Sequence, residues 1–176
     1  MTSTHFFLTG TDTEVGKTFI SVGLLSLLQQ QGYKTVGMKP IASGCEWLDG
    51  QWKNEDALAL IKQSLTDLAY SLINPYAFEP AIAPHIAAER EGVTLSLAKI
   101  KHSYELIAEQ AEAVIVEGAG GWYVPLNAES TMADLAVELQ LPVILVVAIK
   151  LGCINHALLT VAAIEQQGFK KGGWVG

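Results

Sequence analysis

Residues 10–18, GTDTEVGKT, have the residue types and spacing of a phosphate-binding loop (P-loop). They follow a short apolar run and precede a helical pattern, so backbone N–H groups and a helix N-terminus would converge on an anion. In such a loop Lys17 contacts the β- and γ-phosphates of a nucleotide and the Thr18 hydroxyl binds Mg²⁺. The usual spacing puts a glycine at residue 11, whereas this chain has Thr11 there and its glycine one place earlier. The alternative is a chance Gly-Lys-Thr that opens an ordinary helix.

Two carboxylates are candidates for the metal that accompanies a bound triphosphate. A fully apolar segment at residues 113–116 ends on Glu117, and the glycine-rich turn at residues 118–121 lets the backbone approach a ligand closely. Asp56 stands in the first turn of an expected helix, which Asn54 could cap. Both have simpler interpretations, because Glu117 could be a solvated residue at a strand end and Asp56 could merely complement the helix dipole.

Two further features suit a small anionic substrate. Lys39 ends a predicted strand and Ser43 follows shortly, so an ammonium and a hydroxyl could face a cleft at the carboxyl edge of a sheet. Residues 151–155, LGCIN, join a strand to a helix and offer a second helix N-terminus, which suits a carboxylate. A surface lysine without a function and a plain strand-to-helix connection are equally open interpretations.

The elements that must position these residues alternate along the chain. The pattern predicts strands at residues 5–8, 34–40, 113–116, 143–149 and 174–176, and helices at residues 19–31, 54–63, 95–110, 132–139 and 154–167. Residues 41–52 are expected to form a loop, and residues 74–93, with three prolines, a longer functional loop region. Strands that are apolar on both faces favour an α/β fold of the P-loop type, in which a mainly parallel sheet lies between two helical layers in a three-layer αβα arrangement.

Bulk composition narrows the class of protein. The 176 residues fit a single domain, residues 1–176, and a chain that is 50% apolar can bury a sizeable core. A formal charge of −7 argues against nucleic-acid and membrane partners. The first five residues lack the positive start of a signal peptide, and the longest apolar stretch, residues 141–149, is too short to cross a bilayer. We therefore predict a cytoplasmic protein with two free thiols, Cys45 and Cys153.

Together these segments resemble the dethiobiotin synthetase family. The matching segments are residues 10–18, 39–44, 56–58, 74–76, 84–85, 116–121 and 150–156. They follow the family's order and span nearly the whole chain. A phosphate loop is shared by many families, whereas its extra spacing residue, the Lys-Pro pair and the Gly-Cys-Ile-Asn-His segment are much more specific.

The resemblance implies a cyclo-ligase of biotin biosynthesis that forms C–N bonds. Such an enzyme closes the ureido ring of dethiobiotin from 7,8-diaminononanoate (7,8-diaminopelargonate) and CO₂, with ATP as co-substrate and Mg²⁺ as cofactor. One amine forms a carbamate, ATP converts it to a carbamic-phosphoric anhydride, and the second amine attacks to close the ring. The resemblance also implies a homodimer in which the substrate site is shared across the interface.

Residue roles follow from the resemblance position by position. It makes Lys17 and Lys39 catalytic, and Thr18, Asp56 and Glu117 metal ligands. The nucleotide-binding residues are Thr13, Glu14, Val15, Gly16, Lys17, Thr18, Phe19, Glu117 and Gly118. The substrate-binding residues are Ser43 beside the carbamate and Gly152, Cys153, Ile154 and Asn155, which come from the partner subunit. Pro84 and His85 are expected near the cleft, with no chemistry assigned to His85. In the family an asparagine after the Gly-Trp-Val segment helps hold adenine, so a chain ending at Gly176 is expected to lack the family's C-terminal segment.

There are two rival interpretations: another enzyme on the same scaffold, and a nucleotide switch, which is a different class of protein. An amide synthetase of the corrinoid a,c-diamide type shares the scaffold but adds a glutaminase domain. Nucleotide switches such as the partition ATPases carry a second lysine early in the phosphate loop, where this chain has Asp12. GTPases carry an Asn-Lys-x-Asp motif, which these 176 residues lack.

Overall fold

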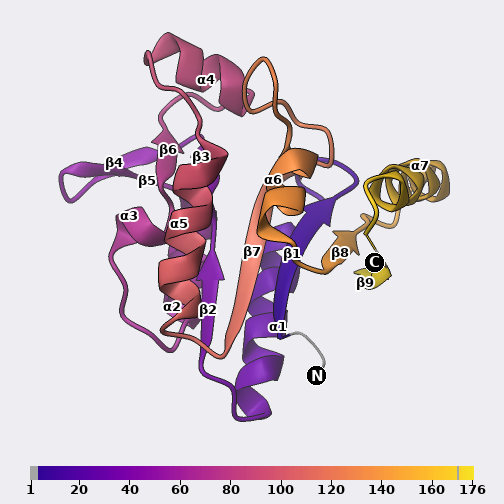
Figure 1. Cartoon of the computed structure of the whole chain (residues 1–176), viewed down its shortest axis with the longest axis horizontal. Coiled ribbons are helices and arrows are strands. Elements are labelled where there is room, and N and C mark those ends of the chain that lie inside the picture. Colours follow the sequence, from indigo (N-terminus) through magenta and orange to yellow (C-terminus); the bar gives the residue numbers. More distant parts are fainter. Residues whose placement is uncertain (1–3, 170) are drawn as a thin grey trace.

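The computed structural model describes residues 4–169 and 171–176 and is built on a five-stranded parallel sheet (Figure 1). The strand order is β2-β7-β1-β8-β9. These strands are β1 (His5–Gly10), β2 (Thr35–Met38), β7 (Ala113–Gly121), β8 (Val143–Val146) and β9 (Lys171–Val175). Residues 1–3, which carry part of the signal-peptide argument, lie outside the described residues.

Helices cover both faces of this sheet. The helices α1 (Lys17–Gln30) and α2 (Glu55–Gln63) pack together on one face, and α5 (Leu97–Ala108) and α6 (Met132–Leu139) on the other (Figure 1). The helix α7 (Cys153–Gln166) follows β8 and lies beside it. The predicted α/β fold is confirmed. Among the described residues, no helix is long and apolar enough to span a membrane.

Alternation along the central strands explains why both faces are buried. Successive side chains of a strand point to opposite faces, so Phe7 joins the core under α5 and α6, while its neighbour Leu8 joins the core under α1 and α2. In β7, Val114 and Val116 lie on the first side and Ile115 on the second, all fully buried. Strands with two buried faces read as continuous apolar runs, which is the pattern in the sequence.

The prediction of a loop at residues 41–52 is partly wrong. It contains three short strands, β3 (Ile41–Ser43), β4 (Glu46–Leu48) and β5 (Gln51–Lys53), the last ending one residue beyond it. The strands β4 and β5 form a hairpin closed by Asp49 and Gly50, both with positive φ (51° and 80°). This geometry suits a two-residue Asp-Gly turn. Strands of three residues are too short to show a periodic signal.

The long loop region predicted at residues 74–93 also contains regular structure. It holds β6 (Tyr76–Phe78), which pairs in parallel with β3, and the helix α4 (Pro84–Arg90). Pro84 stands at the start of α4, where a proline is favoured because its missing N–H would be unpaired anyway. A further short helix, α3 (Tyr70–Ile73), was not predicted. The prolines of this region therefore predict a loop, but one of them, Pro84, begins a helix.

Boundaries of the central elements shift by a few residues. The helix α1 begins at Lys17, two residues earlier than predicted, and β8 ends at Val146, three residues earlier. β7 does not end at Glu117 but continues to Gly121, with a register shift against β1 between Leu8 and Gly10. The extra residues of β7 therefore form a bulge between Glu117 and Gly121, where a glycine-rich turn is predicted.

Two asparagine side chains hold the chain in place near the carboxyl end of β2. Asn54 caps α2 as predicted, because its side-chain oxygen accepts hydrogen bonds from the N–H groups of Asp56 (3.1 Å) and Ala57 (3.3 Å). The buried Asn74 donates its amide to the carbonyl oxygens of Lys39 (2.6 Å) and Tyr76 (3.1 Å). Lys39 itself lies between β2 and β3, so Asn74 pins the junction of the two sheets.

Candidate active site

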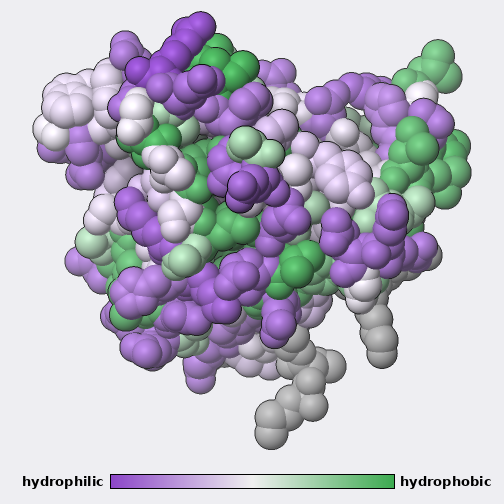
Figure 2. All heavy atoms as spheres, turned by 45° about the horizontal axis from the view of Figure 1, so that its top comes forward, coloured by the Kyte–Doolittle hydropathy of each residue, from purple (hydrophilic) through white to green (hydrophobic). Residues whose placement is uncertain are grey.

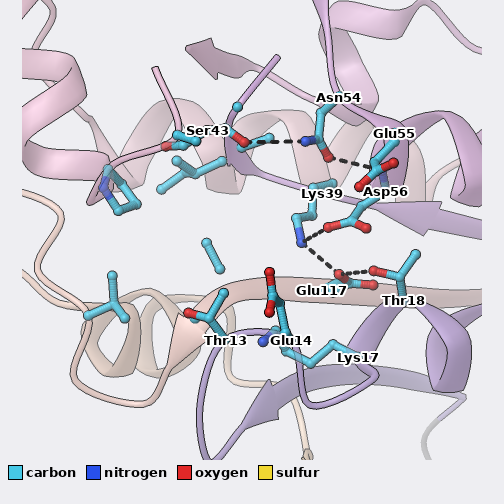
Figure 3. A pocket seen from close by; sticks show the side chains of 18 of the residues that line it. Thr13, Glu14, Lys17, Thr18, Lys39, Ser43, Asn54, Glu55, Asp56 and Glu117 are labelled. Carbon is cyan, nitrogen blue, oxygen red and sulfur yellow. Dashed lines mark hydrogen bonds and ion pairs between the residues drawn. The ribbon is translucent and has the colours of Figure 1, made fainter. Parts of the chain in front are cut away.

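A cleft of about 900 Å³ opens at the carboxyl ends of the central strands (Figure 3). Its walls come from the phosphate loop, β3, the start of α2, the segment before α4 and the turn after β7. The lining residues are Thr13, Glu14, Gly16, Lys17, Thr18, Phe19, Lys39, Ile41, Ala42, Ser43, Gly44, Asn54, Glu55, Asp56, Ala81, Ile82, Ala83, Pro84, Glu117, Ala119, Gly120, Val124 and Pro125. A cleft at this edge is where parallel α/β sheets bind ligands.

The phosphate loop is wrapped tightly enough to explain its early glycine. A Cβ atom on Gly10 would lie 2.6 Å from Cγ2 of Val15 and 2.9 Å from the backbone oxygen of Asp12. No larger side chain fits there without moving the loop. Thr11 instead continues towards β8, where its N–H donates to the oxygen of Val146 (3.0 Å). Gly16, with φ of 90°, caps α1 without a side chain, which leaves the helix N-terminus open to an anion.

Lys17 is a buried ammonium held by the loop itself. Lys17 is only 7% exposed, and its Nζ donates to the backbone oxygen of Asp12 (2.9 Å). Burial, together with the positive charge of Lys39, lowers the pKa of Lys17 to about 8. The charged form of Lys17 is therefore partly destabilised in the protein, and the negative charge of a bound phosphate would stabilise it.

Lys39 lies between the two candidate metal-binding carboxylates, Asp56 and Glu117, called here the carboxylate pair. Its Nζ donates to Oδ2 of Asp56 (2.9 Å) and Oε1 of Glu117 (2.6 Å), as Figure 3 shows. Thr18 Oγ1 also donates to Oε1 of Glu117 (2.9 Å), and Ser21 Oγ donates to Oε2 (2.8 Å). Both carboxylate oxygens of Glu117, which is fully buried, therefore accept hydrogen bonds.

The charges in this cluster stabilise one another. Burial alone would lower the pKa of Lys39, but the carboxylates of Glu117 and Asp56 outweigh it and raise that pKa. Burial would raise the pKa of Asp56, but the ammonium of Lys39 and the hydroxyl of Thr18 outweigh it and lower that pKa. Lys39 and Asp56 therefore remain ionised around neutral pH.

The donor set of this cluster fits Mg²⁺. Within residues 4–169 and 171–176, no group of three or more His, Cys, Asp or Glu side chains is arranged to hold a metal alone. Mg²⁺, however, is commonly bound through one or two carboxylates together with substrate phosphates and water. The hydroxyl of Thr18 and the carboxylate pair supply such oxygens beside the phosphate loop, and a cation, the Lys39 ammonium, already sits among them.

Most of the predicted site residues meet in this cleft, but six do not line it. Thr13, Glu14, Gly16, Lys17, Thr18, Phe19, Lys39, Ser43, Asp56 and Glu117 do. Val15 is buried in the core, and Gly118 packs against β1, where its Cβ position is 3.2 Å from the oxygen of Leu8. Gly152, Cys153, Ile154 and Asn155 lie at the start of α7, outside the cleft of their own chain.

Sequence reasoning missed two residues that shape the cluster. Ser21 supports Glu117, and its position four residues after Lys17, on the same face of α1, was an available signal. Asn54 was predicted as a helix cap, yet it also lines the cleft and its amide contacts the backbone oxygen of Ser43 (3.4 Å). Pro84 lines the cleft as expected, whereas His85 does not.

Comparisons with known proteins agree with this geometry. A family model described as an AAA domain matches residues 4–175. An ATP-dependent dethiobiotin synthetase BioD of Xylella fastidiosa is 50% identical over 175 residues, which cover 99% of this chain and 77% of that protein. Another from Xanthomonas euvesicatoria is 52% identical over 170 residues, covering 97% of this chain and 76% of that protein.

Solved structures support the fold alone. The kinase domain of the Escherichia coli tyrosine kinase ETK matches with a TM-score of 0.59 at 18% identity, over 98% of this chain and 66% of that one. A ParA family ATPase from Chlorobium tepidum matches with a TM-score of 0.51 at 12% identity, over 99% of this chain and 85% of that one. Both likenesses are too distant in sequence to indicate an activity.

Proposed function

Because this chain belongs to the ATP-dependent dethiobiotin synthetase family, we propose that its cleft closes the ureido ring of dethiobiotin in biotin biosynthesis. The substrates are 7,8-diaminononanoate, CO₂ and ATP. The observation that carries the proposal is the meeting of Lys17 and Lys39 in one cleft with the phosphate loop and Ser43. Two cations between a triphosphate site and a hydroxyl suit a reaction that joins two anions.

The chemistry proceeds in three steps. One amine of the substrate adds to CO₂ and forms a carbamate. The carbamate oxygen attacks the γ-phosphorus of ATP, giving a carbamic-phosphoric anhydride and ADP. The second amine then attacks the carbonyl carbon, and inorganic phosphate leaves as the ring closes. The first step creates a negative charge beside the triphosphate and the second brings the two anions together, so fixed positive charge in the cleft lowers their barriers.

The residues divide this work by position. Lys17 and the N–H groups of the phosphate loop hold the β- and γ-phosphates, and Lys39 faces the carbamate beside Ser43. When bound, Mg²⁺ would neutralise phosphate charge, held by Thr18, Asp56 and Glu117. Thr13 and Glu14 border the same space, and Phe19 lies exposed at its rim. A cytoplasmic location of the enzyme is part of this proposal.

The direct test follows phosphate release from Mg·ATP and bicarbonate, with and without 7,8-diaminononanoate, and product mass in parallel. Release that requires the diamine, with dethiobiotin formed one for one, is the expected result. Release that ignores the diamine would instead support a nucleotide switch or another synthetase. Release with the diamine but no product of dethiobiotin mass would contradict ring closure.

Nucleotide binding is expected to take up protons at alkaline pH. Lys17 has a pKa of about 8 in the free protein, so it is largely neutral above that value, and a bound triphosphate restores its charge. Affinity should therefore fall by up to about tenfold per pH unit above pH 8, and binding at about pH 8.5 should take up roughly half a proton or more. Calorimetry of Mg·ADP binding in two buffers with different ionisation enthalpies measures this uptake.

The matched control for this measurement is Lys17→Arg. A guanidinium stays charged throughout this range, so the variant should bind without the proton uptake. Wild-type binding that takes up no proton at about pH 8.5 would contradict the assigned contact between Lys17 and phosphate.

We also propose a homodimer that buries one side of α7. Leu151, Ile154, Leu158 and Leu159, called here the α7 apolar face, are 64% to 105% exposed. Figure 2 shows hydrophobic spheres gathered on the side of the molecule where α7 lies. An exposed apolar patch of this kind commonly marks a protein interface. Burying this face would bring the start of α7, residues 152–155, against a partner subunit, where its N-terminus suits the substrate carboxylate.

Leu158→Glu is expected to convert the dimer to monomers. A charge in the middle of the α7 apolar face must be desolvated on association, at a cost of several kcal/mol. Sedimentation velocity measures the change, and Leu65→Glu, at another leucine exposed to a similar degree (59% against 66%), is the control. A dimer that survives Leu158→Glu unchanged would place the interface elsewhere.

A further inference from the structure

In the cluster of Lys39, Asp56 and Glu117, the ammonium of Lys39 balances the negative charge of the two carboxylates. The side chain of Glu117 is 0% exposed and that of Lys39 is 6% exposed, and their nearest atoms are 2.6 Å apart. A buried carboxylate without a cation or full hydrogen bonding costs several kcal/mol. Lys39 supplies that cation to both members of the carboxylate pair.

The oxygens that hold this ammonium are the oxygens assigned to Mg²⁺. Oε1 of Glu117 accepts hydrogen bonds from both Lys39 and Thr18, so the ammonium, the Thr18 hydroxyl and the carboxylate pair share one small volume. Two cations on the same carboxylate oxygen repel each other strongly at low effective dielectric. The ammonium and a directly bound metal therefore compete for one place.

We propose that Lys39 is an exchangeable counter-ion: its ammonium fills the cation place between Asp56 and Glu117 until Mg²⁺ with nucleotide takes that place and releases it. The inference rests on the proposed function for its metal site. Ser43 lies across the cleft from this cluster (Figure 3). The flexible four-carbon stem of lysine allows the ammonium to turn towards Ser43, where the carbamate is proposed to lie. The carbamate-side cation thus becomes available after the nucleotide is loaded.

Removal of the counter-ion should make the protein depend on metal for its stability. Lys39→Met keeps most of the apolar stem and deletes the charge, which leaves the buried carboxylate pair uncompensated. Without metal its Tm should fall by about 10 °C. Mg²⁺ should then bind at least about tenfold more tightly than to the wild type, because no ammonium opposes it. Thermal melting across a Mg²⁺ series and calorimetry of Mg²⁺ binding give both values without an activity assay.

Two further variants separate this effect from a general loss of stability. Lys53→Met removes another largely buried lysine, which pairs with Asp49 in the β4–β5 hairpin, and should leave the Mg²⁺ dependence unchanged. The double variant Lys39→Met/Glu117→Gln removes both charges, so its Tm without metal should recover relative to Lys39→Met while its response to Mg²⁺ is lost. Equal or weaker Mg²⁺ binding by Lys39→Met would overturn the proposal.

The wild type offers a measurement that does not depend on any variant folding. In protein labelled with ¹⁵N-lysine, the Lys39 ammonium should lose its carboxylate-bound NMR signal when Mg·ADP is added, and keep it with ADP and EDTA. A signal unchanged by Mg·ADP would overturn the exchange. Tight Mg²⁺ binding by Lys39→Met, in a protein whose wild type makes no dethiobiotin, would overturn the proposed function and leave the counter-ion exchange standing.

Discussion

Lys39→Ala is expected to lose ring closure by about 10²- to 10³-fold in kcat, while nucleotide binding largely survives. The ammonium of Lys39 lies on the Ser43 side of the phosphate loop, and its hydrogen bonds go to Asp56 and Glu117 and not to the loop. Phosphate contacts from Lys17 and the loop backbone remain in the variant. A charge that acts on the carbamate therefore affects chemistry more than ATP affinity.

The two readouts for Lys39→Ala must be measured separately. Dethiobiotin formation at saturating substrates gives kcat, and titration with a fluorescent ATP analogue in excess Mg²⁺ gives Kd for the nucleotide. Lys53→Ala, which removes a lysine outside the cleft, is the control and should change neither value. Equal losses of kcat and nucleotide affinity in Lys39→Ala would count against a carbamate-side role.

Glu117→Ala is expected to destabilise the protein by about 3–5 kcal/mol. It leaves the buried ammonium of Lys39 with Asp56 alone, which is half-buried, and it removes the acceptor of the hydroxyls of Thr18 and Ser21. An orphaned buried charge costs more than the mean value of an ion pair, because its desolvation is no longer offset.

Urea unfolding of Glu117→Ala measures this loss. The matched control is Glu138→Ala, which breaks an ion pair with Lys101 whose side chains are about 40% exposed (41% and 42%). Exposed pairs of this kind contribute about 1 kcal/mol or less. A Glu117→Ala protein within that range of the wild type would show that the cluster relaxes without cost.

Local signals made the centre of the site predictable. The phosphate loop is recognised from residue types within nine positions, Glu117 from its place directly after an apolar run, and Asp56 from a helix start. Each signal lies within one element, so the sequence carries it without knowledge of the fold. The same holds for α6, whose bounds match the predicted residues 132–139.

The remaining parts depend on contacts between distant segments. Lys39 meets Glu117 across 78 residues, and no periodicity records that pairing. The segment 81–84 and the turn at residues 124–125 line the cleft only because β3 pairs with β6 and β7 continues past Glu117. A motif likewise indicates a stretch of chain but not which side chains turn inward, as the buried position of Val15 shows. The roles of residues 152–155 stay a prediction, since they require a second subunit.

The junction held by Asn74 joins two walls of the cleft that differ in local stability. The nucleotide wall belongs to the five-stranded sheet, whereas Ser43 and Ala42 belong to the two-stranded β3–β6 sheet. Small sheets open locally at lower free energy than central ones. Amide protons of β3 and β6 should therefore exchange with deuterium sooner than those of β1 and β7. Bound diamine, by bridging the two walls, should slow exchange on the weaker side most.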